Sequence, residues 1–147
     1  MKFHRISGFS LIELMIAVVI VGILTAIAVP SYHSHIVKAS RAAAQTELLE
    51  LASLQEKIYL NSNAYTANMT TAYTGNSTGG LGKTGGLTAD SKYTLTVVAP
   101  GQTHTITATP VAGSRQAGDG CLTIQENGLR QWHQNNDACN SASPQSW

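Results

Sequence analysis

The feature that most limits how this chain can fold is an apolar run over residues 9–29. The only ionisable side chain in this run is the carboxylate of Glu13. A helix needs about 20 apolar residues to cross a bilayer, so the run is long enough to span one. A carboxylate well inside the hydrocarbon costs about 2.5–3.5 kcal/mol on insertion scales. The sequence therefore predicts a membrane-spanning helix in which some other group offsets the cost of Glu13.

The flanks of the run allow more than one interpretation. Lys2 and Arg5 precede it, as in secretory signal peptides, and Ala26-Ile27-Ala28 supplies an A-x-A cleavage pattern. The run is longer than a typical signal-peptide core, however, and a carboxylate is unusual in such a core. An uncleaved anchor with a cytoplasmic N-terminus fits the length and the basic flank, but it leaves Glu13 unexplained.

A third interpretation comes from the segment Gly8-Phe9-Ser10-Leu11-Ile12-Glu13. With the apolar helix and Pro30-Ser31-Tyr32 after it, the segment closely resembles the N-terminal signature of type IV prepilins. In that family a membrane-embedded peptidase cuts after the glycine and N-methylates the new first residue. The resemblance implies cleavage between Gly8 and Phe9, and methylation of Phe9.

Cleavage would supply the partner that Glu13 needs. The new α-amino group of Phe9 is largely protonated near neutral pH, because its reference pKa is about 7.7–8.0. Opposite charges attract strongly in a low-dielectric setting, and a helix N-terminus also favours a carboxylate. The amine of the same chain lies four positions away, within reach on a helix. The resemblance implies instead that Glu13 meets the Phe9 amine of a neighbouring subunit and sets the axial register of a filament.

Composition narrows the remaining possibilities. The 147 residues leave room for one ordinary soluble domain after the apolar run. A net charge of +1 excludes an overall electrostatic affinity for nucleic acid or acidic membranes, though not a local basic patch. Cys121 and Cys139 lie behind a membrane or export segment, so a disulfide formed outside the cytoplasm is favoured over a metal site.

The hydrophobic pattern beyond the run predicts an α+β fold. Leu48, Leu51 and Ile58 form an apolar stripe at helical spacing, which indicates a long helix over residues 9–60. Gly22 and Pro30 interrupt its first half, and a kink is expected there. Alternating residues predict strands at 93–99, 104–109, 121–125 and 129–132. The long helix would pack on this roughly four-stranded antiparallel sheet, as it does in pilins.

The predicted organisation has three parts. Residues 1–8 form the prepilin leader, residues 9–30 the transmembrane or filament-core half-helix, and residues 31–147 a periplasmic globular domain. Within the domain we expect a helix at 31–60, a variable loop at 61–92, the sheet at 93–132 and a disulfide-bounded region at 121–147.

Catalytic chemistry has no support in the sequence. His33 and His35 are two positions apart and point to different helix faces, so they are poorly placed to chelate a metal. The glycines of residues 61–92 are too irregular for a phosphate-binding loop. We expect no enzymatic activity, no metal and no cofactor.

The resemblance implies a structural or assembly-priming subunit of a type IV pilus, supporting pilus biogenesis, twitching motility, adhesion or DNA uptake. The segment from Gln55 to Asn61, with Ala64-Tyr65, is similar to minor pilins of the type IVa class. The implied partners are other pilin subunits, the prepilin peptidase and the inner-membrane assembly machinery. The implied location is the inner membrane before assembly, with the N-terminus cytoplasmic, and the extracellular filament afterwards.

Two alternatives stay open. A DNA-binding competence minor pilin would need a basic surface, which would require a cluster of Lys83, Lys92, Arg115 and Arg130. Aromatic and imidazole rings for stacking on bases would come from Tyr93, His104, Trp132 and His133. A major pilin or a type II secretion pseudopilin shares the N-terminal signature. The pseudopilin interpretation ranks below the pilus interpretation. Major pseudopilins are expected to carry an acidic calcium site near the C-terminus, and the acidic residues available here, Asp119, Glu126 and Asp137, are too widely spaced for it.

Overall fold

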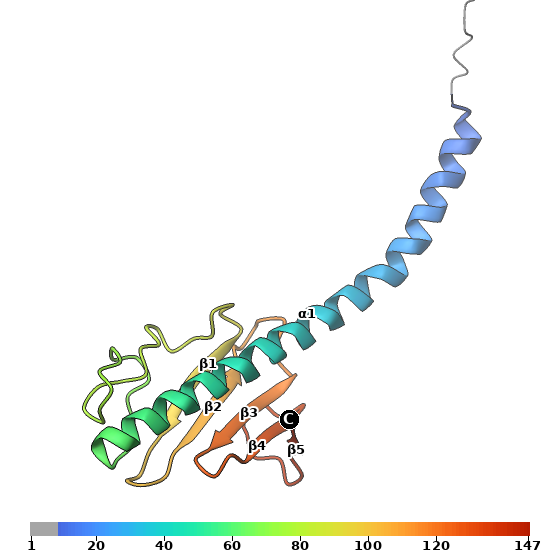
Figure 1. The fold of residues 1–147 in the computed structure, drawn as a ribbon. Helices are drawn as coiled ribbons and strands as arrows, with labels where there is room; N and C mark the ends of the chain where they lie inside the picture. Colours follow the sequence, from blue (N-terminus) through green and yellow to red (C-terminus); the bar gives the residue numbers. More distant parts are fainter. Residues whose placement is uncertain (1–8) are drawn as a thin grey trace, which may run out of the picture. The chain divides into compact units, whose positions relative to one another are not determined.

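The computed structural model describes residues 9–147, so the leader and Gly8 lie outside the described residues. The elements are α1 (Leu11–Ser62), β1 (Tyr93–Val98), β2 (Thr105–Pro110), β3 (Gly120–Gln125), β4 (Arg130–Gln134) and β5 (Gln145–Ser146) (Figure 1). The predicted α+β fold is confirmed. Its sheet has five strands in place of the expected four, because two residues near the C-terminus add a short edge strand.

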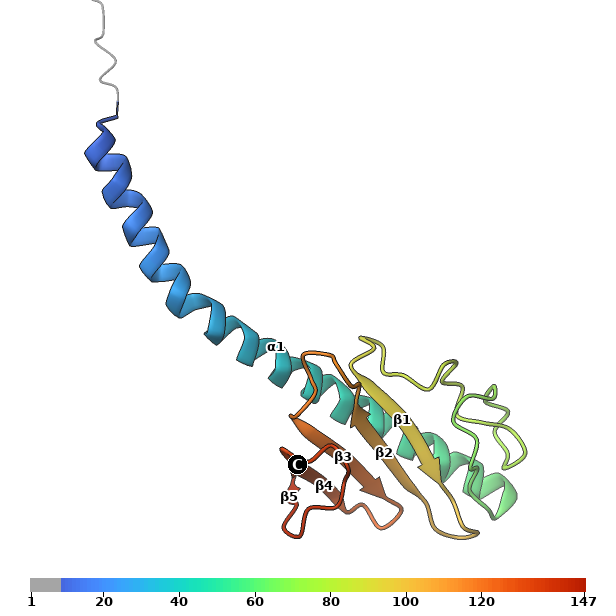
Figure 2. The same cartoon turned by 180° about the vertical axis from the view of Figure 1, so that it is seen from behind.

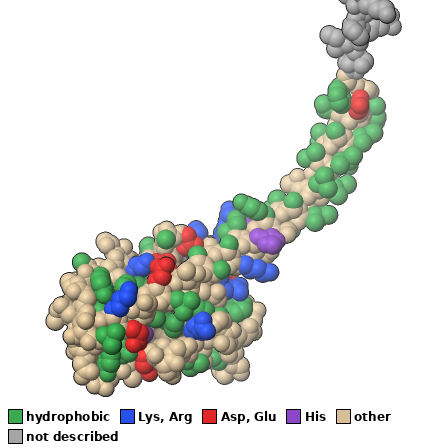
Figure 3. Space-filling model, viewed as in Figure 1, with side chains coloured by type: hydrophobic (Ala, Val, Ile, Leu, Met, Phe, Trp, Pro, Cys, Tyr) green, Lys and Arg blue, Asp and Glu red, His purple; other side chains and the backbone are tan. Residues whose placement is uncertain are grey.

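The described chain forms two compact units, which divide after Ile36. In the first unit α1 is helical through both Gly22 and Pro30. Its hydrophobic side chains are exposed along its length, as the space-filling view shows (Figure 3). Within residues 9–147, α1 is the one helix long and apolar enough to cross a membrane, by length and composition.

In the second unit, Val37–Trp147, the later part of α1 lies across one face of the sheet (Figure 1). The opposite face carries no helix, as the view from behind shows (Figure 2). The strands follow the order β1-β2-β3-β4-β5, and each is antiparallel to the next. Strands that neighbour in sequence therefore neighbour in space, which short connections between consecutive strands favour.

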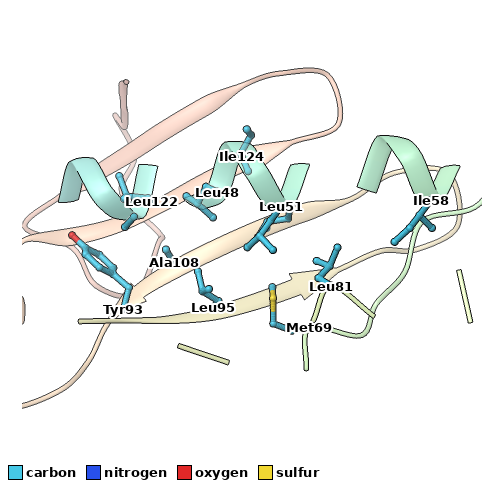
Figure 4. Close-up of a cluster of buried hydrophobic side chains, with 12 residues drawn as sticks. Leu48, Leu51, Ile58, Met69, Leu81, Tyr93, Leu95, Ala108, Leu122 and Ile124 are labelled. Carbon is cyan, nitrogen blue, oxygen red and sulfur yellow. The ribbon is translucent and has the colours of Figure 1, made fainter. Parts of the chain in front are cut away.

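The core lies between α1 and the sheet (Figure 4). Leu48, Leu51 and Ile58 follow one another at spacings of three and seven residues, which place them on one face of the helix, and all are fully buried against the strands, as the apolar stripe predicted. Burying each such side chain stabilises the fold by about 1.5–3 kcal/mol. The other buried hydrophobic residues of the cluster are Ala44, Met69, Leu81, Tyr93, Leu95, Ile106, Ala108, Leu122 and Ile124.

Two glycines fix the course of the chain around β3. Gly128, in the turn between β3 and β4, has a φ of 78°, which a side chain disfavours and which an Asn-Gly pair such as Asn127-Gly128 commonly provides in a tight turn. Gly120 begins β3 with a φ of 103°, and a Cβ there would lie 2.1 Å from the carbonyl oxygen of His133. The close approach of β3 and β4 at this point therefore requires glycine.

The long connection between α1 and β1 is packed against the domain despite its lack of regular strands. Met69 and Leu81 enter the core from it. The amide of Gln55 on α1 bonds both backbone groups of Thr66, with Nε2 donating over 2.7 Å to its carbonyl and Oε1 accepting over 3.0 Å from its N–H. This pairing satisfies the fully buried side chain of Gln55 and holds the start of the connection to the helix.

Candidate assembly site and nucleic-acid interface

The start of α1 presents the two residues that the sequence assigned to filament register. The carbonyl of Ser10 accepts hydrogen bonds from the amides of Glu13 and Leu14, both at 3.1 Å, and so closes the first turn. Glu13 lies in that turn, where the helix dipole stabilises a carboxylate. Phe9 and Glu13 are both exposed at the same end of the helix. Each is accessible to a neighbouring molecule.

The exposed apolar surface over residues 9–29 is unusually large for a soluble protein. Phe9 and Leu11 are 77% and 76% exposed, and Val29 at the other end is 48% exposed. Contiguous exposed apolar surface of this kind marks contact with a membrane or with other proteins. Gly22 has no atom within 4 Å of the position a Cβ would take, so a close contact within the subunit does not explain this glycine.

A buried polar network joins α1 to the loop between β2 and β3. Arg41 donates from Nε to Asp119 Oδ2 over 2.8 Å and from Nη2 to Oδ1. The hydroxyl of Tyr93 donates to Asp119 over 3.0 Å, and Gln116 Nε2 donates to Tyr93 and to Asp119, both at 2.7 Å. Burial, with the nearby Asp119 charge, raises the pKa of Tyr93 well above its ordinary value. The phenol therefore stays protonated.

The same arginine stacks on Trp132, with its guanidinium carbon 3.7 Å from the ring centroid. Trp132 Nε1 donates to the carbonyl of Asp119 over 3.1 Å. Tyr93 and His104 are at most 1% exposed. These three rings are thus buried or engaged within the domain, which corrects the expectation that they present faces for stacking on bases.

The C-terminal region is closed by a disulfide between Cys121 and Cys139, whose Cα atoms are 5.5 Å apart. Asp137, two residues before the second cysteine, accepts from the amides of Gly118 at 2.8 Å and Gly120 at 3.0 Å. The carboxylate thus ties the region to the loop before β3. From the sequence, Asp137 is recognisable only as an acidic residue, because no local pattern indicates that its carboxylate binds backbone amides 17 and 19 positions away.

Lys83 is already partnered. Its Nζ pairs with Oε1 of Glu47 on α1, and Glu47 Oε2 accepts from the amide of Ala89 over 3.2 Å. The two charged side chains are 28% and 10% exposed. Much of the positive charge of Lys83 is therefore neutralised locally, and this lysine serves first to hold the α1–β1 connection against the helix.

The remaining three cations lie at two ends of the sheet. Lys92 precedes β1, and its carbonyl accepts from the amide of Val111, so it lies at the end of the sheet from which the Arg115 loop departs. Arg130 begins β4 and pairs in register with Ile124, near the opposite end. At about 3.3 Å per residue and 4.8 Å per strand, Lys92 and Arg130 are roughly 20 Å apart. The four cations do not form one cluster.

From β1 to β4, the helix-free face of the sheet carries no lysine, arginine, aspartate or glutamate. Side chains alternate across a strand, so the partners of the core residues point to this face. From β1 to β4 they are Thr94, Thr96, Val98, Thr105, Thr107, Thr109, Cys121, Thr123, Gln125, Gln131 and His133. Such a face lacks the lysines and arginines that bind phosphates. On the face shown in Figure 3, basic and acidic side chains are interspersed.

In the described part of the chain, no group of three or more His, Cys, Asp and Glu side chains is placed to hold a metal ion. Asp119 and Asp137, two of the acidic residues considered for a calcium site, are occupied by Arg41 and by backbone amides.

Comparison with known families agrees with this organisation. The prokaryotic N-terminal methylation motif matches residues 3–29. A profile of the family described as "Type IV minor pilin ComP, DNA uptake sequence receptor" matches residues 30–125, more than half of the chain. The chain belongs to this family of type IV minor pilins.

The chain is also similar to individual pilins and to one protein of a type II secretion system. A fimbrial protein of Neisseria meningitidis serogroup A is 40% identical over 77 residues, 52% of this chain and 45% of that protein. The type IV major pilin PilA of Myxococcus xanthus is 39% identical over 61 residues, 42% of this chain and 28% of that protein. The type II secretion system core protein G of Pectobacterium carotovorum is 34% identical over 62 residues, 42% and 40% of the two chains. The chain spans less than half of the length of each relative.

Proposed function

We propose that the protein is a minor subunit of a type IV pilus, without catalytic activity. The observation that carries this proposal is the exposed apolar helix that has Glu13 in its first turn and continues into a domain of the minor pilin family. The helix would hold the subunit in the inner membrane, with its N-terminus cytoplasmic, until assembly. The same apolar surface would then pack against other pilin subunits.

Processing by a prepilin peptidase and handling by the inner-membrane assembly machinery belong to this proposal. The N-terminal methylation motif supports the first of these steps. Once cleaved, the Phe9 amine of one subunit would neutralise Glu13 of the next. A carboxylate that is costly in an apolar setting becomes stabilising when it is paired. Correct axial register is thus the arrangement in which every such charge has a partner.

Deleting the gene tests the minor assignment. A minor pilin reduces piliation or twitching when absent, and it remains scarce in sheared filaments. A dominant band in sheared filaments would show a major subunit instead. If the protein is instead recovered with a type II secretion system and not with pili, it is a pseudopilin. The 34% identity to the type II secretion core protein G is the reason to include this alternative.

DNA binding is a second candidate function, and the family match over residues 30–125 is the observation that favours it. The four cations alone do not define a site, since Lys83 is paired with Glu47 and Arg130 lies at the other end of the sheet. Lys92 and Arg115 lie toward one end of the sheet, with Arg115 exposed. We therefore propose these two as phosphate contacts, with Lys83 and Arg130 contributing less.

Salt dependence tests the DNA proposal. Each phosphate contact contributes about 0.9 to the slope of log K against log salt concentration. The variant with Lys92→Gln and Arg115→Gln is expected to bind DNA more weakly and to lose about 1.8 from this slope. Lys57→Gln, which removes an exposed lysine of α1, is the control and leaves the slope unchanged. An unchanged slope in the double variant would reject these contacts, and the absence of binding by the full chain would reject the receptor function.

A further inference from the structure

His104, the residue before β2, has an environment that neither pilus assembly nor DNA binding explains. Its side chain is 1% exposed. Neither Nδ1 nor Nε2 has a hydrogen-bond partner among residues 9–147. A neutral imidazole carries one N–H donor and one acceptor, and a buried polar group without a partner costs free energy. The burial of an imidazole without hydrogen-bond partners therefore calls for a functional explanation.

The imidazole packs against an aromatic ring from the segment that follows α1. The Tyr65 ring meets it edge to face, with centroids 4.5 Å apart and an interplanar angle of 67°. Tyr65 in turn stacks on Tyr59 at 4.7 Å, and its hydroxyl donates to Glu56 Oε1 over 3.1 Å. Burial, together with Glu56, raises the pKa of Tyr65 to about 12, so this phenol does not titrate below neutral pH.

The backbone of His104 is paired with the turn between β3 and β4. Its amide donates to Glu126 Oε2 over 3.3 Å, and the amide of Glu126 donates to its carbonyl over 3.2 Å. His104 therefore lies where the end of α1, the segment after it, the β1–β2 hairpin and the β3–β4 turn meet. The titratable groups around it are Glu56 and Tyr59 from α1, Tyr65 from the connection and Glu126 from the turn.

We propose that His104 is an acid-sensitive latch at this junction. The neutral ring packs against Tyr65 and keeps the segment after α1 closed on the β1–β2 hairpin. A protonated ring needs water or a direct anionic partner. It would leave the apolar site and release Tyr65, while the core between α1 and the sheet stays folded. The latch is independent of whether the protein binds DNA.

The direction of the pH dependence follows from burial. Burial lowers the pKa of His104, although Glu56 and Glu126 act in the opposite direction. In the open junction the imidazole is hydrated and takes its ordinary pKa of about 6.5. Below that pH the open form binds a proton that the closed form excludes. The opening equilibrium then rises by up to about tenfold per pH unit, until the pH reaches the pKa of the closed form.

Hydrogen exchange of the full chain in detergent micelles tests the latch. The reporters are the amides of Thr66, His104 and Glu126, which are hydrogen-bonded at or beside the junction. After correction for intrinsic exchange rates, their protection is expected to fall by up to about tenfold per pH unit below pH 6.5. Amides in the middle of β3 are expected to keep theirs. Equal losses throughout the domain would indicate global unfolding and overturn the proposal.

Substitution separates His104 from other titrating groups. His104→Phe, which fills the site without titrating, and His104→Gln are each expected to give junction protection that does not change with pH. His133→Asn is the matched control. His133 is also buried, and its Nδ1 has no hydrogen-bond partner in the described part of the chain, but it lies on the other face of the sheet. It should retain the wild-type pH dependence at Thr66. Dependence that survives in both His104 variants would overturn the latch.

One measurement needs no variant. The carbon-bound imidazole protons of His104 report its titration directly by nuclear magnetic resonance in the full chain. A closed-state pKa below 6.5, with junction opening that follows it, supports the latch. A pKa at or above 6.5 would show that the closed junction accepts the proton, and the proposal would be wrong.

Discussion

The guanidinium of Arg41 donates to both carboxylate oxygens of Asp119, 78 positions further along the chain. This contact joins α1 to the loop before β3. The side chains are 18% and 9% exposed, so the pair is largely removed from water. Tyr93, Gln116 and Trp132 bond to the same aspartate. Asp119 therefore forms hydrogen bonds to residues of the helix, of β1 and of β4.

Arg41→Ala is expected to lower the free energy of unfolding by about 2–3 kcal/mol, because it leaves Asp119 buried without its cation and exposes Trp132. Urea unfolding of the full chain in detergent, followed by tryptophan fluorescence, measures this change. The control is Arg130→Ala, whose guanidinium is exposed and lies 5.6 Å from the Trp147 ring. A loss in Arg41→Ala no larger than that of the control would show that the network is not stabilising.

Paired serine substitutions at Cys121 and Cys139 are expected to lower the free energy of unfolding by about 3 kcal/mol, because the open chain regains the entropy of a loop that the disulfide closes over a separation of 18 residues. Denaturant unfolding compares the variant with the oxidised protein. The oxidised protein treated with reductant should match the variant. Two free thiols in protein purified from filaments would contradict the disulfide.

A double-mutant cycle on Glu47→Gln and Lys83→Gln is expected to give a coupling free energy of about 0.5–2 kcal/mol, since the two charges meet at a partly buried position. Lys83→Gln alone is also expected to change DNA affinity less than Lys92→Gln does, because Lys83 is already neutralised by Glu47. A coupling of zero would mean that the pair does not hold the α1–β1 connection. A larger DNA effect at Lys83 would move the proposed interface toward that connection.

Much of this architecture is predictable from local patterns. The sequence shows an apolar stripe at Leu48, Leu51 and Ile58 and an alternation of side chains in β1 and β2. The period of each pattern identifies the element as a helix or a strand. The strand ends differ from prediction by one or two residues, which is the ordinary variation in assignment. β5 was missed because two residues cannot show a period.

The polar contacts were not predictable, because they join residues far apart in the sequence. Nothing near Gln55 indicates that its amide binds Thr66, and nothing near Asp119 indicates Arg41. The expectation of base-stacking rings failed for the same reason. Tyr93 and Trp132 are aromatic residues in strands, and whether such rings face the helix or the solvent depends on the register of the whole sheet. The N-terminal methylation motif, by contrast, is a continuous segment of the chain and is visible in the sequence itself.

Glu13→Gln is expected to prevent incorporation into filaments and to leave the domain folded, because the uncharged amide removes the attraction for a neighbouring Phe9 amine. The fraction of the protein in sheared filaments relative to the membrane fraction measures this effect. Glu50→Gln, which removes an exposed carboxylate from the second half of α1, is the control and should assemble normally. Normal incorporation of Glu13→Gln would refute the role of this carboxylate in register.

The N-terminus of the protein recovered from sheared filaments tests the central claim most directly. Mass spectrometry is expected to find a chain that begins at Phe9 and carries a methyl group on its α-amino nitrogen. That result would show that a prepilin peptidase cut after Gly8, and that the apolar helix was kept for assembly. A mature chain that begins at Val29, with the helix removed by an ordinary signal peptidase, would contradict the account.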